Sequence, residues 1–174
     1  GRTVRVHFER ADDMATTGGR APMGATYAAS VELSTGVISS VEIEATFDGG
    51  CNHYVGDVSM ATSWSDNCYR HADYDYRARA LTSNTPGQAA CRAPGVIQSQ
   101  PVHELVIERA AEVCGLSPDA VREANFYHDG DVTPYGTKLG GDFNWTAPQL
   151  FATAREKWRI GARREAIADF NRAN

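Results

Sequence analysis

The segment from Ser83 to Gln98 has the residue types best suited to chemistry in this sequence. It reads SNTPGQAACRAPGVIQ, with a single cation at Arg92 and with Gly95 close to the start of an apolar, helix-like repeat. Backbone amides at a helix start, together with the positive end of the helix dipole, stabilise anionic oxygens. The pattern therefore indicates a loop that could hold an anion. The alternative interpretation is an ordinary loop-to-helix connection in which Arg92 is a surface charge.

The histidines and cysteines are scattered and form no metal-binding motif. Zinc and iron–sulfur sites need closely spaced ligands, such as C-x-x-C or H-E-x-x-H, and neither pattern occurs. We expect each histidine to be exposed or hydrogen-bonded within the fold. We expect the cysteines to be reduced and mostly buried, as in a reducing compartment, with two disulfides as the alternative. The histidines are His7, His53, His71, His103 and His128, and the cysteines are Cys51, Cys68, Cys91 and Cys114.

Length and composition indicate a globular chain. Its 174 residues are about one domain, with 42% apolar residues, 22% charged residues and a net charge of −5. This acidic balance disfavours a nucleic-acid partner, and there is no apolar stretch long enough for a membrane span. No signal peptide is recognisable after Gly1, so we expect a cytoplasmic protein. The basic residues between Arg155 and Arg172 are interpreted as a solvated helix face or a surface against another part of a larger protein.

The first half of the chain is dominated by alternating apolar residues, which predict strands. A short turn at residues 34–36 joins two of them into a hairpin. A short helix or irregular loop is expected around Val55–Trp64, and loops are expected at residues 9–23 and 82–95. The predicted strands are residues 3–8, 25–33, 37–47 and 74–81.

The second half of the chain is predicted to be helical. Apolar residues from Val102 to Val113 recur at helical spacing, and Gly115 stands where a helix would end. Ser117-Pro118-Asp119 is typical of a helix start, and this helix is expected to run to about Phe126. After a loop at residues 131–146, a last helix is expected over about 148–171, kinked or weakened at Gly161.

The order of strands followed by helices predicts an α+β fold. We expect a two-layer sandwich with an antiparallel sheet of about four strands and helices packed on one face. The whole chain, residues 1–174, is expected to be a single domain. Within it, residues 1–82 form mainly strands, residues 83–98 form the loop described above, and residues 99–174 form mainly helices.

Several segments in order resemble the xanthine dehydrogenase/aldehyde oxidase family of molybdenum hydroxylases. Each segment is short, but together they cover nearly the whole chain and keep the family's order and spacing. The resemblance is carried by Gly1-Arg2, Val4-Arg5, Asp13-Met14, Thr17-Gly18-Gly19-Arg20, Tyr27, Thr35-Gly36, Asp66-Asn67-Cys68-Tyr69, Cys91-Arg92-Ala93-Pro94-Gly95, Gln98, Cys114 to Arg122, Asn125-Phe126-Tyr127, Gly130-Asp131, Thr133 and Phe170-Asn171.

The resemblance implies particular roles for residues of the loop. Arg92 matches the family arginine whose backbone lies near molybdenum, so Arg92, Ala93 and Gly95 are expected to bind the cofactor. Pro94 falls where xanthine-type members place a phenylalanine that stacks on the purine. Met60 falls where they place an arginine that orients the purine, so both are expected to bind substrate. The family's catalytic glutamate has no counterpart in this segment.

The resemblance also implies a larger parent enzyme, of which this chain is one piece of the molybdopterin-binding portion. That parent would be a homodimeric oxidoreductase of purines or of aldehydes and N-heterocycles, with 2Fe-2S clusters and FAD in other parts of the same polypeptide. The isolated chain is expected to hold no cofactor and to be inactive. The alternatives are a stand-alone small-anion-binding module and an interaction domain that uses the basic final helix.

Overall fold

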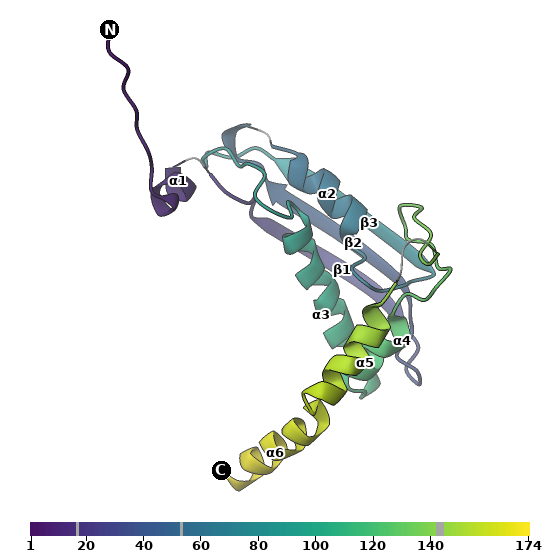
Figure 1. Ribbon diagram of the computed structural model, residues 1–174. Helices are drawn as coiled ribbons and strands as arrows, with labels where there is room; N and C mark the ends of the chain where they lie inside the picture. The colour runs from purple at the N-terminus through teal and green to yellow at the C-terminus, as the bar shows by residue number, and fades with distance from the viewer. Residues whose placement is uncertain (17, 53, 142–144) are drawn as a thin grey trace. The chain divides into compact units, whose positions relative to one another are not determined.

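A computed structural model describes residues 1–16, 18–52, 54–141 and 145–174 (Figure 1). The chain forms two compact units, Gly1–Asn125 and Phe126–Asn174, and each is described by itself. The described elements are α1 (Arg10–Thr16), β1 (Met23–Val31), β2 (Ile38–Asp48), the 3-10 helix η1 (Gly50–Asn52), α2 (Gly56–Trp64), β3 (Asp73–Leu81), α3 (Val96–Cys114), α4 (Pro118–Asn125), α5 (Ala147–Lys157) and α6 (Ile160–Ala173).

The first unit is built on a sheet with the strand order β1-β2-β3. The predicted hairpin is confirmed: β1 and β2 are antiparallel, and Gly36 takes a φ of +73° in the turn between them. The pair β2–β3, however, is parallel rather than antiparallel. The reason is that α2 lies between the two strands and carries the chain back, so that β3 starts beside the beginning of β2.

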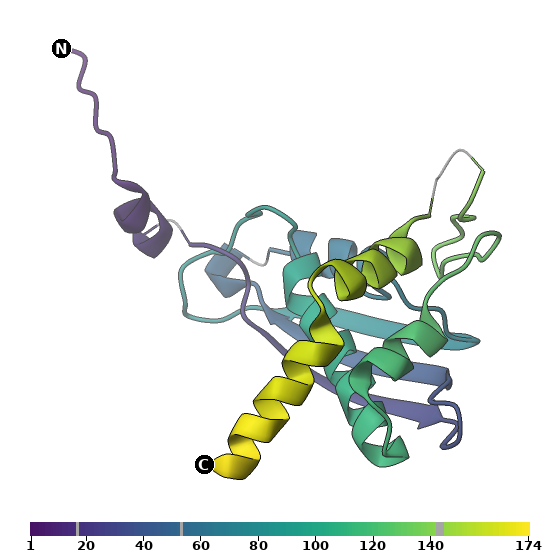
Figure 2. The same cartoon turned by 60° about the horizontal axis from the view of Figure 1, so that its bottom comes forward.

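The core of this unit lies on one face of the sheet, beneath α2 and α3 (Figures 1 and 2). Alternate residues of β2 are buried there, while Glu42 and Glu44 on the other face are exposed. This arrangement confirms the α+β fold with helices on one face of the sheet. The buried apolar residues of β2 and α3 are Ile38, Val41, Ile43, Ala45, Phe47, Val106, Ile107, Ala110 and Ala111.

The helix α3 begins earlier than the apolar repeat predicts. It starts at Val96 and continues through Pro101, which lies on the exposed side, where the unpaired carbonyl of Ile97 can reach water. Its end is as predicted, because Gly115 takes a φ of +67° and closes the helix with backbone hydrogen bonds. The predicted helix start at Ser117-Pro118 is also confirmed as the beginning of α4.

The strand predicted over residues 3–8 is wrong. These residues have no regular structure, and the apolar side chains of Val4, Val6 and Phe8 are 83%, 72% and 57% exposed. A strand needs hydrogen bonds from a neighbouring strand, and none of the described strands pairs with this segment. Part of the predicted loop that follows is instead α1, a seven-residue helix without buried residues.

The second unit contains two helices where one kinked helix was predicted. The helices α5 and α6 are separated at Trp158-Arg159, and Arg159 takes a φ of +50°, which interrupts the helix just before Gly161. The indole of Trp145 donates a hydrogen bond to the Tyr127 carbonyl at 2.7 Å. Across the described residues, none of the helices combines the length and apolar character that crossing a bilayer would require.

Candidate functional site

The loop of residues 83–95, called the Arg92 loop below, joins β3 to α3 and is held by backbone atoms on two sides. On one side the amide of Gln88 donates to the carbonyl of Gly49, at 3.3 Å, in the turn after β2. On the other side the amide of Ala89 donates to the carbonyl of Gly19, at 3.1 Å, in the segment before β1. The loop therefore lies between two segments that are far apart in the sequence.

Glycines stand where these backbones come closest. A Cβ atom on Gly18 would lie 2.0 Å from the carbonyl oxygen of Gly87, and one on Gly50 would lie 2.2 Å from that of Pro86. Both glycines also have a positive φ, +80° and +66°. A side chain at either position would push the loop away, so its path depends on the absence of side chains.

The end of the loop is seated on α2 through Gly95. This residue has a φ of +72°, and a Cβ atom on it would lie 1.9 Å from the Asp57 carbonyl oxygen and 2.8 Å from the Ala61 nitrogen. The close approach places the Pro94–Gly95 step against the turn of α2 that carries Met60. Pro94 is half-buried, and Met60 is 38% exposed.

The Arg92 peptide has a second cation beside it. A guanidinium nitrogen of Arg20, Nη2, donates to the carbonyl oxygen of Arg92 at 3.0 Å. Arg92 and Ala93 are exposed, and Ala93 takes a φ of +51°. Among the described residues, the amides of Arg92, Ala93 and Gly95 donate no hydrogen bond. Arg92 and Ala93 thus carry unbonded donors on an exposed stretch just before α3, whereas Gly95 is buried.

A buried acid and amide anchor the segment that carries Arg20. The carboxylate of Asp57 is fully buried, and its Oδ2 accepts from the Ala21 amide at 3.1 Å and from Nε2 of Gln98 at 2.9 Å. The same Gln98 nitrogen lies 3.2 Å from the Ala21 carbonyl oxygen. These hydrogen bonds tie Ala21 to both α2 and α3. Burial, and then the nearby Asp57, also raise the pKa of Tyr54.

Asp48, the last residue of β2, fixes the beginning of the loop. Its carboxylate accepts hydrogen bonds from the Ser83 hydroxyl at 2.6 Å, the Gly50 amide at 2.9 Å and the Thr85 hydroxyl at 3.2 Å. The bond from Ser83, followed by that from Gly50, lowers the pKa of Asp48 despite the opposing effect of burial.

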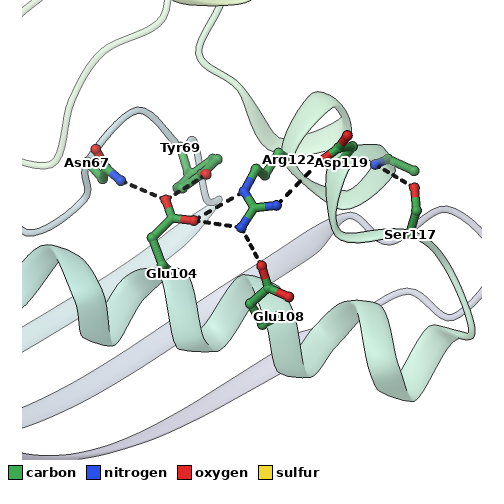
Figure 3. Close-up of polar contacts among 8 residues, drawn as sticks. Asn67, Tyr69, Glu104, Glu108, Ser117, Asp119 and Arg122 are labelled. Atoms are coloured by element: carbon green, nitrogen blue, oxygen red, sulfur yellow. Dashed lines mark hydrogen bonds and ion pairs between the residues drawn. The ribbon is translucent and has the colours of Figure 1, made fainter. Parts of the chain in front are cut away.

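A set of charged and polar side chains, called the Glu104 cluster below, joins α3 to α4 and to the link between α2 and β3 (Figure 3). Glu104 accepts from Asn67 at 2.9 Å and Tyr69 at 2.8 Å, and its other oxygen accepts two bonds from Arg122, both at 3.1 Å. Burial opposes the charge of Arg122, but hydrogen bonds to Glu108 and Glu104 outweigh it and raise the pKa of this guanidinium. The cluster consists of Asn67, Tyr69, Glu104, Glu108, Asp119 and Arg122.

Comparison with known proteins identifies the family. A family model described as "Molybdopterin cofactor-binding domain" matches residues 1–126, which nearly coincide with the first compact unit. The chain belongs to this family.

Relatives of the chain are oxidoreductases by name. It is 33% identical to aldehyde oxidase 1 of Oryctolagus cuniculus and 31% identical to xanthine dehydrogenase/oxidase of Mus musculus. Each comparison covers 100% of this chain and 13% of the relative, so the chain spans about an eighth of these proteins.

Solved structures share the fold. Quinoline 2-oxidoreductase from Pseudomonas putida 86 has a TM-score of 0.81 at 18% identity, over 95% of this chain and 22% of that chain. The aldehyde oxidoreductase from Desulfovibrio gigas has a TM-score of 0.69 at 22% identity, over 81% of this chain and 15% of that chain. The resemblance to the xanthine dehydrogenase/aldehyde oxidase family is therefore confirmed.

For this member of the molybdopterin-binding family, the structure brings the predicted site residues into one region. Arg92, Ala93, Pro94 and Gly95 are consecutive, and Gly95 packs on the α2 turn that bears Met60. Their roles in binding cofactor and substrate stay predictions. Within the described residues, no three histidine, cysteine or acidic side chains gather as metal ligands.

The scattered histidines and cysteines differ among themselves. His103 is fully buried, whereas His7 and His128 are exposed. Cys51 is exposed, contrary to the expected burial, and the other three cysteines are partly buried; all four thiols are free. Thr17 and His53 lie outside the described residues.

Sequence reasoning did not assign the residues that hold the loop. Arg20 and Gln98 belong to segments that resemble the family, but Asp57 and Gln98 stand 41 positions apart with no motif to join them. The local signal that could have been used was the series of glycine pairs at 18–19 and 49–50, since paired glycines mark close backbone approach as well as turns.

Proposed function

We propose that the chain supplies one wall of the molybdenum-cofactor pocket in a larger oxidoreductase of the xanthine dehydrogenase/aldehyde oxidase type. Membership of the molybdopterin-binding family supports the cofactor class. The observation that carries the proposal is the pair of open, exposed amides at Arg92 and Ala93, in a loop whose path is fixed by glycine contacts.

The residues present fit an anionic group rich in oxygen atoms. Three amides without hydrogen-bond partners among the described residues precede α3, where the helix dipole adds partial positive charge. The guanidinium of Arg20 adds a full positive charge at the Arg92 peptide, and Arg92 itself is a second cation of the loop. Backbone donors of this kind need no rearrangement to receive a ligand.

In this proposal each residue either binds the cofactor or orients a group that binds it. The amides of Arg92, Ala93 and Gly95 donate to oxygens of the bound group. Arg20 fixes the Arg92 peptide, and a cation on a peptide carbonyl also makes the N–H of the next residue, here Ala93, a stronger donor. When bound, the molybdenum cofactor supplies the oxidation–reduction chemistry.

We further propose aldehydes or N-heterocycles, rather than xanthine, as substrates. A methionine at position 60 offers no charged donor for a purine oxygen, and a proline at position 94 offers no aromatic face. Loss of a charge-assisted hydrogen bond weakens recognition strongly. In this proposal Met60, which is 38% exposed, and Pro94 would instead offer apolar surface to the substrate.

The substrate assignment is tested in the longer polypeptide that contains this chain. We expect the double substitution Met60→Arg with Pro94→Phe to raise kcat/KM for xanthine relative to an aromatic aldehyde by about tenfold or more. Thr62→Arg, which adds the same charge at an exposed position of α2, is the matched control. An unchanged ratio of kcat/KM for the two substrates in the double variant would show that Met60 and Pro94 do not line the substrate pocket.

The pocket assignment is tested with the 174-residue chain. We expect the chain alone to hold no molybdenum by metal analysis and to oxidise neither aldehydes nor purines, because the 2Fe-2S clusters, FAD and remaining cofactor contacts would belong to other parts of a homodimeric parent. Oxidation by the purified chain would overturn this. Saturable binding of inorganic phosphate, lost in Arg92→Ala, would instead favour the small-anion-binding module.

A further inference from the structure

Two histidine side chains from different elements are in contact on the side of α3 that faces the sheet. His71 lies in the link between α2 and β3, and His103 lies on α3. Their rings are nearly parallel, with centroids 5.0 Å apart, and their Nε2 atoms are 2.8 Å apart. His103 has no exposed surface, and Tyr74 stacks on both rings. The pair is part of the interior rather than of the Arg92 loop.

The remaining ring nitrogens face backbone carbonyls. Nδ1 of His71 is 3.1 Å from the Ile38 oxygen at the start of β2, and Nδ1 of His103 is 3.0 Å from the Ser65 oxygen at the end of α2. A carbonyl oxygen can only accept, so each Nδ1 needs a hydrogen to make these bonds. Both Nε2 atoms then present lone pairs to each other.

The neutral histidine pair has one hydrogen fewer than its buried contacts need. Two neutral imidazoles carry two hydrogens, but the geometry has three contacts that each need one: two N–H to carbonyl bonds and the contact between the Nε2 atoms. In the neutral pair, one buried contact must therefore place a lone pair against a lone pair. One added proton, placed between the Nε2 atoms, would satisfy all three contacts.

We propose that His71 and His103 together form a binding site for a single proton, which their two Nε2 atoms share. The balance of the step is simple: the proton comes from solvent, one N–H bond forms, and the pair gains one positive charge. A second proton is excluded, because it would place two imidazolium groups in contact.

The groups around the pair determine the pH at which it binds the proton. Burial lowers the pKa of both histidines, that of His103 to about 3, while the Ser65 and Ile38 carbonyls act in the opposite direction. The pair is therefore neutral at pH 7 and takes up its proton in acid. The Ser65 carbonyl also belongs to the negative end of the α2 dipole. Charged or titratable residues near the pair on these elements include Asp66, Cys68, Tyr69 and Arg70 of the link, Tyr74 of β3, Glu104 of α3 and Arg122 of α4.

The site would act on the elements that carry the Arg92 loop. Its two carbonyl contacts tie α3 to the end of α2 and link both helices to the start of β2. Because α3 begins at the end of the loop and α2 carries Met60, uptake of the proton would change the contacts within the helix pair on which the proposed pocket rests. The inference concerns the interior alone and does not depend on the proposed function.

The proposal is tested by following the imidazole nitrogens of the 174-residue chain by NMR from pH 8 downward until the chain unfolds. We expect His71 and His103 to change together while the chain stays folded, with a total uptake of one proton. We also expect a scalar coupling between the two Nε2 nitrogens across the shared hydrogen. The exposed His128 provides an independent internal reference. Independent titration of the two rings, or no uptake before unfolding, would overturn the proposal.

Substitutions separate shared proton binding from ring packing. His71→Phe keeps a stacked ring but removes the nitrogens, so His103 should then need about one pH unit more acid, or more, to become protonated. His71→Gln, which keeps a polar group near Nε2, serves the same test if the phenylalanine variant does not fold. His128→Gln should leave uptake by the pair unchanged. Unaltered protonation of His103 in both His71 variants would rule out a shared proton.

Discussion

The Arg92 loop and the Glu104 cluster are both fixed by hydrogen bonds, but the groups that make the bonds differ. In the loop they are mainly backbone atoms, brought together at positions where glycine alone fits. In the cluster they are side chains, most of them charged, that reach one another from three segments (Figure 3). The loop should therefore be sensitive to added volume, and the cluster to lost charge. A binding surface made of backbone donors also stays unchanged when neighbouring side chains vary.

The largest effect is expected from Gly95→Ala. The new methyl group would meet the Asp57 carbonyl oxygen at 1.9 Å, and alanine also disfavours the φ of +72°. We expect a loss of about 3 kcal/mol in the free energy of unfolding, measured by urea denaturation.

The matched control for this change is Gly115→Ala. Gly115 has a similar φ of +67°, but a Cβ atom there would meet nothing within 4 Å. It should cost about 1 kcal/mol, the strain of the backbone alone. Equal losses in the two variants would show that the contact between the loop and α2 is looser than described.

The next largest effect is expected from Glu104→Gln in the charged cluster. Arg122 is mostly buried, with 20% of its side chain exposed, and it would lose one of its two charged partners on α3, with Glu108 remaining. We expect a loss of about 2 kcal/mol, which shrinks in high salt. Glu112→Gln breaks the exposed pair with Arg109 and should cost less than about 0.5 kcal/mol. A Glu104 variant as stable as this control would mean that solvent already screens the cluster.

The sequence predicted well what depends on periodicity or on local turn chemistry. The apolar alternation from Val37 to Phe47 located β2, and Gly115 located the end of α3, because both signals lie within one element. The Arg92 loop was located in the same way, from its proline and glycine content. In each case the residues that carry the signal are neighbours in the chain.

Features that depend on distant partners could not be predicted. The alternation at residues 3–8 is as regular as that of a strand, but no described strand supplies its hydrogen bonds. The parallel pairing of β3 depends on the path of the chain through α2. The contact of Arg20 with Arg92 spans 72 positions, and that of His71 with His103 spans 32. Residue spacing contains no information about such pairs.

A smaller effect is expected from Arg20→Gln, which tests whether a side chain also helps to fix the loop. The bond from Arg20 to the Arg92 carbonyl is exposed, so global stability should hardly change. Hydrogen exchange of the Ala89 amide, which donates to the Gly19 carbonyl next to Arg20, should nevertheless become about fivefold faster, as expected for one lost bond to a charged group. Arg79→Gln, which alters an exposed bond to Thr46, is the control. Identical rates of hydrogen exchange in the two variants would show that backbone contacts alone, without the Arg20 side chain, hold the loop.

The smallest effect is expected from acid, through Asp48 at the start of the loop. Hydrogen bonds from Ser83 and then Gly50 hold the pKa of Asp48 below its ordinary value in the folded chain. A carboxyl with a lowered pKa stabilises the fold above its unfolded pKa, near 4, and this contribution disappears as the pH falls through the folded pKa. The difference in urea midpoint between the chain and Asp48→Asn should therefore be present at pH 6 and shrink as the pH falls below 4. Asp169→Asn, at an exposed carboxylate of α6, is the control for the loss of one negative charge. A difference that stays constant as the pH falls below 4 would mean that hydrogen bonding by the neutral group, rather than the charge of Asp48, holds the start of the loop.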